Sequence, residues 1–343
     1  MPGRRPAGGQ DTGLTALRDM AARGVPAHDG PPGTITQRDL LPGYVDHLKK
    51  LVDLSAIRPL TVAADAGNGM AGHTVPKVFE GLPIRLVPLF FELDGTFPNH
   101  EPNPIDPENL RDLQRAVLES GADIGLAFDG DADRCFVVDE RGQIVPPSVL
   151  TALIAVRELA REPGATVIHN LITSRAVPEI IAEHGGTAVR TRVGHSFIKA
   201  RMAETGAVFG GEHSGHFYFR DFWFADSGML VAMHTLAALG EQDAPLSELL
   251  AGFARYAASG EINSEVADQA GMTALVRAEY TSHPGVSADN LDGLTISGDG
   301  WWFNLRPSNT EPLLRLNVEA ADEDTMLRLR DEVLGMVRQG QPG

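Results

Sequence analysis

The sequence predicts an α/β protein in which two tandem α/β domains, with mixed sheets flanked by helices, precede a C-terminal α+β domain. Short apolar runs typical of strands alternate with helical segments from about residue 40 to residue 250, and several consecutive strand-like runs follow before one last helix. With 343 residues, 43% of them apolar, the chain can bury two or three separate cores. The predicted boundaries are 1–39 for a leader without a core of its own, then 40–147, 148–255 and 256–343.

The first α/β domain is predicted to end one of its strands at a cluster of acids. Its predicted elements are a helix around Tyr44, Leu48 and Leu51, a strand at 60–64, a turn at 67–69 and a helix after it, a strand at 84–91, a helix starting at 106–108 and a strand at 123–128. Open α/β sheets bind ligands at the carboxyl ends of their parallel strands. The acidic loop that follows residue 128 is therefore placed where a site is expected.

The remaining two domains are predicted from the same patterns. The second has helices at 148–161, 176–184 and 197–204 and strands at 166–168, 187–191 and 207–209, whereas the third has strands at 294–296, 301–305 and 314–318 and a terminal helix at 322–337. No sequence repeat at a fixed short period is present.

Charge and cysteine content exclude several classes of protein. The balance of 29 basic and 46 acidic residues gives 29 − 46 = −17, which repels nucleic acid and anionic membranes, so neither is expected as a partner. The single Cys135 excludes an internal disulfide, and no stretch approaches the roughly 20 apolar residues needed to span a bilayer. The polar segment after Arg5 lacks the apolar core of a secretory signal. We therefore predict a cytoplasmic location.

The loop Asp129-Gly130-Asp131-Ala132-Asp133-Arg134 indicates a site for a divalent cation. Three acids on alternate residues repel one another, and a cation offsets that repulsion. A helix-loop-helix calcium loop would need glycine where Arg134 stands, and a strand follows instead of a second helix. Two alternatives stay open here, a solvated turn and, less favoured, a phosphatase that uses Asp129 as its nucleophile.

A second motif lies at Gly210-Gly211-Glu212-His213-Ser214-Gly215-His216. The carboxylate of Glu212 and the hydroxyl of Ser214 can project to one side and bracket neighbouring sugar hydroxyls, and the glycines let the backbone approach a ligand. A Gly-rich turn with a chance glutamate is the structural alternative. Nearby, His195 and Lys199 start a helix and can share one face at i and i+4.

The third motif, Arg306-Pro307-Ser308-Asn309-Thr310-Glu311-Pro312 with Arg315, predicts an anion cradle between two strands. A guanidinium binds phosphate through parallel hydrogen bonds, and hydroxyl and backbone donors complete the set. The alternative is a capped hairpin with Arg315 on a solvated face.

These three motifs, in this order and at this spacing, closely resemble the α-D-phosphohexomutase family, most nearly its bacterial phosphomannomutases and phosphoglucomutases, over residues 10 to 340. The resemblance implies a Mg²⁺-dependent isomerase that interconverts hexose 6-phosphate and hexose 1-phosphate. It also implies a hexose 1,6-bisphosphate, as activator and as an intermediate that reorients between two phosphoryl transfers. Domains 40–147, 148–255 and 256–343 would bind metal, sugar and phosphate, respectively.

The same resemblance implies a role for each site residue. The metal ligands would be Asp129, Asp131 and Asp133. The catalytic residues would be Arg134, which would contact phosphate, and His195 and His216, which are candidates for proton transfer. The residues that bind substrate would be Glu212, Ser214, Lys199, Arg306, Ser308, Asn309, Thr310 and Arg315.

One part of the family pattern is missing from the sequence. Members carry their phosphoserine in a loop of the Thr-Ala-Ser-His-Asn-Pro type within a first domain, and no such run exists here. Residues 1–39 resemble the segment that follows that domain. We therefore expect residues 1–343 alone to bind hexose phosphates and to turn them over poorly, with a separate first domain or a homo-oligomer as partners that remain open. The alternatives are a non-catalytic sugar-phosphate binding protein and a phosphoglucosamine mutase, although Asn309 beside Ser308 favours mannose or glucose phosphates.

Overall fold

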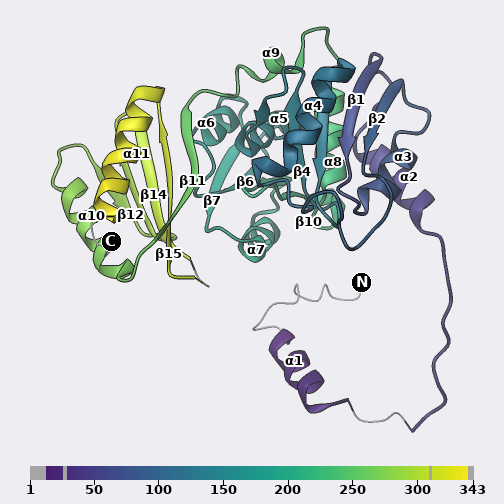
Figure 1. The fold of residues 1–343 in the computed structure, drawn as a ribbon, viewed down its shortest axis with the longest axis horizontal. Helices are drawn as coiled ribbons and strands as arrows, with labels where there is room; N and C mark the ends of the chain where they lie inside the picture. The colour runs from purple at the N-terminus through teal and green to yellow at the C-terminus, as the bar shows by residue number, and fades with distance from the viewer. Residues whose placement is uncertain (1–12, 26–28, 309–310, 339–343) are drawn as a thin grey trace.

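The computed structural model describes residues 13–25, 29–308 and 311–338, and within them the chain forms three five-stranded sheets. The sheets follow one another along the molecule, with the C-terminal sheet at one end and the first sheet towards the other (Figure 1). The first two sheets are mixed and flanked by helices, and the third is antiparallel. This confirms the predicted fold class.

The first sheet has the order β2-β1-β3-β4-β5. Its strands are β1 Leu60–Asp65, β2 Ile84–Leu89, β3 Ile124–Phe128, β4 Cys135–Asp139 and β5 Ile144–Val145. The strand β1 pairs in parallel with β2 and β3, whereas β4 returns antiparallel to β3. The accompanying helices are α2 Leu41–Leu51, α3 Ala71–Val78 and α4 Arg111–Ser120, the last preceded by a 3₁₀ turn, η2 Pro107–Leu110.

The second sheet repeats this topology. Its order from the opposite edge is β7-β6-β8-β9-β10, with β6 parallel to β7 and β8 and with β9 antiparallel to β8. The strands are β6 Thr166–Asn170, β7 Thr187–Thr191, β8 Phe209–Gly211, β9 Phe217–Phe219 and β10 Ala225–Asp226. The helices are α5 Pro147–Arg161, α6 Ala176–Glu183, α7 His195–Thr205, η3 Arg220–Phe222, α8 Gly228–Gly240 and α9 Leu246–Leu250.

The third sheet is entirely antiparallel in the order β11-β15-β14-β13-β12. Its strands are β11 Ala257–Glu265, β12 Ser287–Asp289, β13 Leu294–Gly298, β14 Trp301–Pro307 and β15 Leu313–Ala320. Two helices, α10 Gln269–Thr281 and α11 Glu323–Arg338, pack on this sheet. The arrangement is the α+β unit that the sequence predicts.

The hydrophobic cores do not divide as the sheets do. One continuous cluster of buried side chains extends from Leu48 in α2 to Leu250 in α9 and joins the first two sheets, whereas the third sheet has a cluster of its own. Helix α8 is central to the shared core, because all of its residues are buried. Its first turn is capped by the Ser227 side chain, which accepts a hydrogen bond from the Leu230 amide.

Several boundaries differ from the predicted ones. The strand predicted at 84–91 ends at Leu89, because Phe90 adopts a positive φ of 53° that no strand tolerates. The Asp106 side chain does cap a helical turn, but that turn is 3₁₀ before α4 begins. The sequence patterns also missed α8, β11 and α10.

The predicted leader includes α1 Leu14–Arg23, in which no residue is buried. It lies apart from the three sheets (Figure 1). Along the described residues, no helix combines the length and the apolar character needed to cross a bilayer.

Candidate active site

The acidic loop leaves the carboxyl end of β3, a fully buried strand. Ala132 takes a positive φ of 63°, and its amide donates to the Asp129 carbonyl, which curls the loop on itself. As a result, the carboxylates of Asp129, Asp131 and Asp133 each offer an oxygen within 4.8 Å of the others. The structure thus brings the three predicted metal ligands together.

Burial and mutual repulsion act on this cluster. Burial first, and then the nearby carboxylates of Asp129, Asp226 and Asp131, together raise the pKa of Asp133 to about 7. Carboxylate oxygens are the ligands that Mg²⁺ prefers. A divalent cation would offset the repulsion, so the residues present fit such an ion.

Arg134 is turned towards the loop that precedes it. Its amide and its Nε both donate to the Asp129 carboxylate, at 3.1 and 2.7 Å, and its Nη1 donates to Asn103 Oδ1 at 3.2 Å. Because Asp129 is 3% exposed and both of its oxygens accept from Arg134, it is poorly placed to attack a phosphoryl group. This geometry disfavours the phosphatase alternative.

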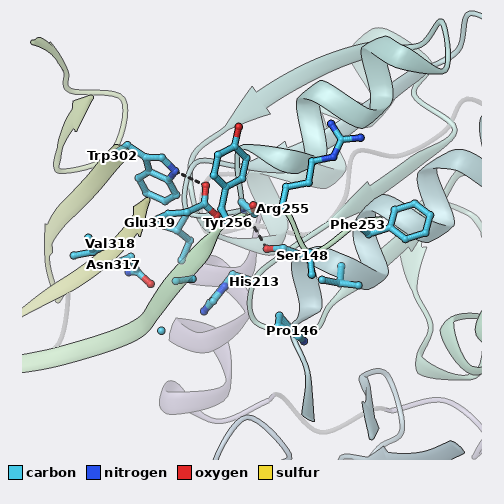
Figure 2. A pocket seen from close by; sticks show the side chains of 16 residues that line it. Pro146, Ser148, His213, Phe253, Arg255, Tyr256, Trp302, Asn317, Val318 and Glu319 are labelled. Carbon is cyan, nitrogen blue, oxygen red and sulfur yellow. Dashed lines mark hydrogen bonds between the residues drawn. The ribbon is translucent and has the colours of Figure 1, made fainter. Parts of the chain in front are cut away.

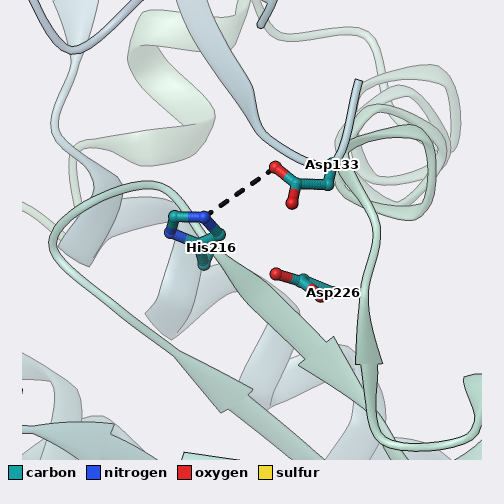
Figure 3. A group of neighbouring side chains, drawn as sticks. All are labelled: Asp133, His216 and Asp226. Atoms are coloured by element: carbon teal, nitrogen blue, oxygen red, sulfur yellow. Dashed lines mark ion pairs between the residues drawn. The ribbon is translucent and has the colours of Figure 1, made fainter. Parts of the chain in front are cut away.

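The β8–β9 loop approaches the acidic loop from the second sheet. Arg134 and His216 form an antiparallel β-bridge, and His216 Nε2 lies 3.8 Å from Asp133 Oδ1. The Ser214 hydroxyl lies 3.0 Å from His216 Nδ1. Figure 3 shows that His216, Asp133 and Asp226 lie close together. Two motifs that are far apart in the sequence therefore form one polar region.

Glu212 is buried, with 2% of its surface exposed. One of its carboxylate oxygens accepts from the Tyr218 hydroxyl at 2.7 Å, and the other accepts from the Gly194 amide at 3.0 Å. Gly194 is the N-cap of α7, so the carboxylate also faces the positive end of that helix. The Glu212 side chain thus joins the β8–β9 loop to the start of α7.

His195 and Lys199 of α7 have different surroundings. The Lys199 ammonium lies 3.1 Å from Asp226 Oδ1 and 5.3 Å from the centre of the Tyr218 ring. His195 is exposed, and its imidazole makes no hydrogen bond or ion pair within the described residues. Burial is the main cause that lowers the pKa of His216. His216 is therefore neutral near pH 7, in contact with the acidic cluster.

The predicted anion cradle lies at the ends of β14 and β15. Arg306 and Arg315 stand opposite each other in the sheet, and both bind Glu261 of β11, at 3.4 and 3.2 Å. The Ser308 amide donates to the Leu313 carbonyl. The predicted substrate-binding residues Asn309 and Thr310 lie outside the described residues.

A separate cavity of about 90 Å³ lies where the second and third sheets meet (Figure 2). His213 of the β8–β9 loop lines it together with Trp302, Asn317 and Glu319 of the third sheet. Glu319 accepts from Trp302 Nε1 and from the Arg175 amide, and so ties the two sheets together. The cavity contains none of the predicted site residues.

Sequence reasoning missed four residues that support these sites: Asn103, Tyr218, Asp226 and Glu261. All of them contact a motif residue through the fold, so no local spacing indicates them. The three prolines within residues 97–104 are the one signal in the sequence, because they stiffen this segment. The structure places the segment against the acidic loop, with Pro102 and the Phe97 ring beside Gly130.

Comparison with protein-family models gives three matches in chain order. Residues 42–142 match the phosphoglucomutase/phosphomannomutase alpha/beta/alpha domain II, residues 146–256 match domain III, and residues 261–336 match the C-terminal domain. A phosphomannomutase of Salmonella montevideo is 39% identical over 336 residues, which cover 96% of this chain and 73% of that relative.

Solved structures agree with this comparison. A phosphoglucomutase/phosphomannomutase family protein from Burkholderia thailandensis superposes with a TM-score of 0.84 at 33% identity, covering 98% of this chain and 71% of its own. An Aspergillus fumigatus N-acetylphosphoglucosamine mutase, solved in complex with GlcNAc-6P and magnesium, shares the fold with a TM-score of 0.65 at 16% identity, over 87% of this chain and 66% of its own.

Proposed function

The chain belongs to the phosphoglucomutase/phosphomannomutase family, and from this we propose that it is a Mg²⁺-dependent phosphohexomutase that interconverts hexose 6-phosphate and hexose 1-phosphate. Phosphohexomutases are isomerases. The observation that carries the proposal is the meeting of Asp129, Asp131 and Asp133 with the β8–β9 loop, because it joins a cation site to a candidate sugar site.

In this proposal the three aspartates hold Mg²⁺. The donor set supports it, because it consists of carboxylates alone, and the distantly similar Aspergillus enzyme was solved with magnesium. The bound ion would supply charge stabilisation to the transferring phosphoryl group. Arg134 would contact the same phosphate with a guanidinium that Asp129 holds in place.

The substrate would span the β8–β9 loop and the cradle of the third sheet. Arg306, Ser308 and Arg315, with Asn309 and Thr310, would bind its phosphate. Glu212 and Ser214 would select among its hydroxyls, with Lys199 nearby. We propose mannose or glucose phosphates as substrates, and a hexose 1,6-bisphosphate as intermediate and activator.

Two histidines are the candidates for moving protons. Transfer of a phosphoryl group to a sugar hydroxyl breaks the P–O bond to the donor oxygen and forms a new P–O bond to the sugar. A base must accept the proton of the attacking hydroxyl, and an acid must supply a proton to the donor oxygen that leaves. His216 is neutral near pH 7 because burial lowers its pKa, and it lies beside the acidic cluster. His195, exposed at the start of α7, is the second candidate.

We also propose that residues 1–343 alone turn over slowly, because the sequence has no loop of the Thr-Ala-Ser-His-Asn-Pro type. The same proposal assigns metal binding to residues 40–147, sugar binding to 148–255 and phosphate binding to 256–343. It also includes a partner, which would be either a separate first domain or a second copy in a homo-oligomer.

The test separates binding from turnover. Mannose 1-phosphate binding is measured by calorimetry with Mg²⁺, and mutase activity is then assayed with a trace of glucose 1,6-bisphosphate. Saturable binding with slow turnover is expected. Turnover near that of other phosphohexomutases would refute the proposed slow turnover, and absence of binding would refute the proposed function.

A further inference from the structure

The two arginines of the cradle are a like-charged pair on neighbouring strands. Arg306 of β14 stands directly opposite Arg315 of β15, and their side chains are 13% and 31% exposed. Like charges at opposite positions of an antiparallel pair repel each other. An arrangement of this kind needs a compensating negative charge when no phosphate is bound.

Glu261 supplies that charge from the adjacent strand. Its Oε2 lies 3.4 Å from Arg306 Nη2 and its Oε1 lies 3.2 Å from Arg315 Nη1, so the carboxylate bridges the two guanidinium groups. The residue stands on β11, which bends there because its register against β15 shifts between Ala258 and Glu261. The irregularity lies directly before the residue that reaches the cradle.

The guanidinium groups keep donors that Glu261 does not use. The Nε atoms of Arg306 and Arg315 are buried and have no hydrogen-bond partner within the described residues. Buried donors without an acceptor cost free energy, and an anion with several oxygens relieves that cost. Two such donors, on arginines that share one carboxylate, indicate a position prepared for a second anion.

We propose that Glu261 is a counter-ion built into the phosphate cradle: it holds the two arginines in place without phosphate and weakens their binding of phosphate. This inference rests on the proposed function. A mutase must release one phosphate of its bisphosphate intermediate from the cradle and bind the other, so a cradle that binds too tightly slows exchange. Glu261 is then a positioning residue that sets the rate of release.

The charge balance gives the direction of the effect. With Glu261 ionised the three side chains carry a net charge of +1, and in Glu261→Gln they carry +2, while the amide oxygen can still accept from one arginine. Removal of a partly exposed like charge beside a phosphate dianion is expected to tighten inorganic phosphate binding about fivefold. A merely structural role predicts the opposite sign, because misplaced arginines bind phosphate less well.

The first measurement is the dissociation constant of inorganic phosphate, by calorimetry on the full chain at low ionic strength. Glu261→Gln is compared with wild type and with a control, Glu241→Gln. The control also removes one carboxylate charge, but from the ion pair that Glu241 forms with Arg157. Tighter binding only in Glu261→Gln supports the proposal. Unchanged or weaker binding overturns it. If Glu261→Gln fails to fold, Glu261→Asp replaces it, because the shorter side chain moves the charge away from the arginines by one methylene. This variant is expected to tighten phosphate binding about twofold. Unchanged or weaker phosphate binding in Glu261→Asp also overturns the proposal.

The second measurement tests the pairing without phosphate. The effect of Glu261→Gln on the urea unfolding midpoint is measured twice, once in the wild-type chain and once in the Arg306→Gln/Arg315→Gln double variant. Glu261→Gln is expected to lower the midpoint only when both arginines are present. An equal shift in both backgrounds overturns the counter-ion role. If neither wild type nor Glu261→Gln binds phosphate, the proposed cradle is refuted, and so is the proposal that Glu261 weakens phosphate binding. The unfolding comparison still decides whether Glu261 pairs with the arginines.

Discussion

Arg134 and His216 are joined by an antiparallel β-bridge, and each stands directly before the return strand of its own sheet. Arg134 precedes β4 and His216 precedes β9, and the two sheets have the same strand topology. The bridge therefore joins equivalent positions of two copies of one arrangement. This backbone bridge helps to fix how the acidic loop faces the β8–β9 loop.

Asp131→Asn separates metal binding from folding. Among the described residues the Asp131 carboxylate makes no hydrogen bond or ion pair and is exposed, so its loss removes a candidate ligand and relieves repulsion within the loop. We expect Mg²⁺ to bind at least about tenfold more weakly by calorimetry, with an unfolding midpoint in EDTA equal to or above that of wild type. The control is Asp331→Asn, at an exposed aspartate beside Arg330. Unaltered Mg²⁺ affinity in Asp131→Asn would remove Asp131 from the proposed ligand set.

Gly228→Ala tests the packing of α8 beneath the acidic loop. A Cβ at Gly228 would overlap the Arg134 carbonyl and lie 3.0 Å from the Ala132 carbonyl. We expect a loss of about 1–3 kcal/mol in the free energy of unfolding, together with weaker Mg²⁺ binding. In Gly252→Ala the added Cβ meets nothing within 4 Å, so its unfolding free energy should stay within about 0.5 kcal/mol of wild type. Equal behaviour of the two variants would contradict the packing argument.

Tyr218→Phe removes the hydroxyl that holds Glu212. The carboxylate keeps the Gly194 amide but loses a buried donor, which costs about 1.5–3 kcal/mol for a hydrogen bond to a charged group. Hexose phosphate binding should weaken more than Mg²⁺ binding, and calorimetry with each ligand measures both. Tyr280→Phe is the matched control, because its longer hydrogen bond to Glu332 joins α10 to α11, the two helices that pack on the third sheet. Hexose phosphate affinity equal to that of wild type would argue against Glu212 as a sugar ligand.

His100 gives the fold a pH dependence on the alkaline side. Its hydrogen bond with Asp65, at 3.1 Å, is the main cause that raises the pKa of His100 to about 9. Because the folded pKa lies above the unfolded value of 6.5, the stabilisation is complete below pH 6.5 and is lost as the pH rises through about 9. The loss should be about 1–2 kcal/mol, since water still reaches the ring.

The measurement is urea unfolding at pH 6 and pH 9.5 for wild type and His100→Gln. The variant should be less stable than wild type at pH 6, and the gap should close at pH 9.5. His73→Gln, at an exposed position on α3, should show no such convergence. A gap that stays constant with pH would mean that the Asp65–His100 contact is not an ion pair.

The sequence could predict those parts of the fold that depend on local patterns. The strand predicted at 187–191 coincides with β7, and the helix predicted at 322–337 differs from α11 by one residue at each end. Helix α8 was missed because it is apolar on every side and so has no amphipathic period. Its role as the centre of the shared core follows only from the three-dimensional packing.

The candidate site divides in the same way. Asp129, Asp131 and Asp133 lie on alternate residues of one short loop, so their convergence could be predicted from the sequence. The contact of Glu261 with Arg306 spans 45 positions, and that of Asn103 with Arg134 spans 31. No short-range pattern predicts pairs of this kind. The repeated topology of the first two sheets was equally hidden, because strand order is repeated without any repeat in the sequence.

The first two sheets share a core that the third does not enter. Energetically the chain then consists of two cooperative blocks, a large one that carries the acidic cluster and the β8–β9 loop and a small one that carries the arginine cradle. Local melting of the small block would leave the other half of the site assembled. Contacts such as that of Glu319 with the Arg175 amide still join the two blocks, but a substitution within the small block can alter the cradle while the packing around the acidic cluster stays the same.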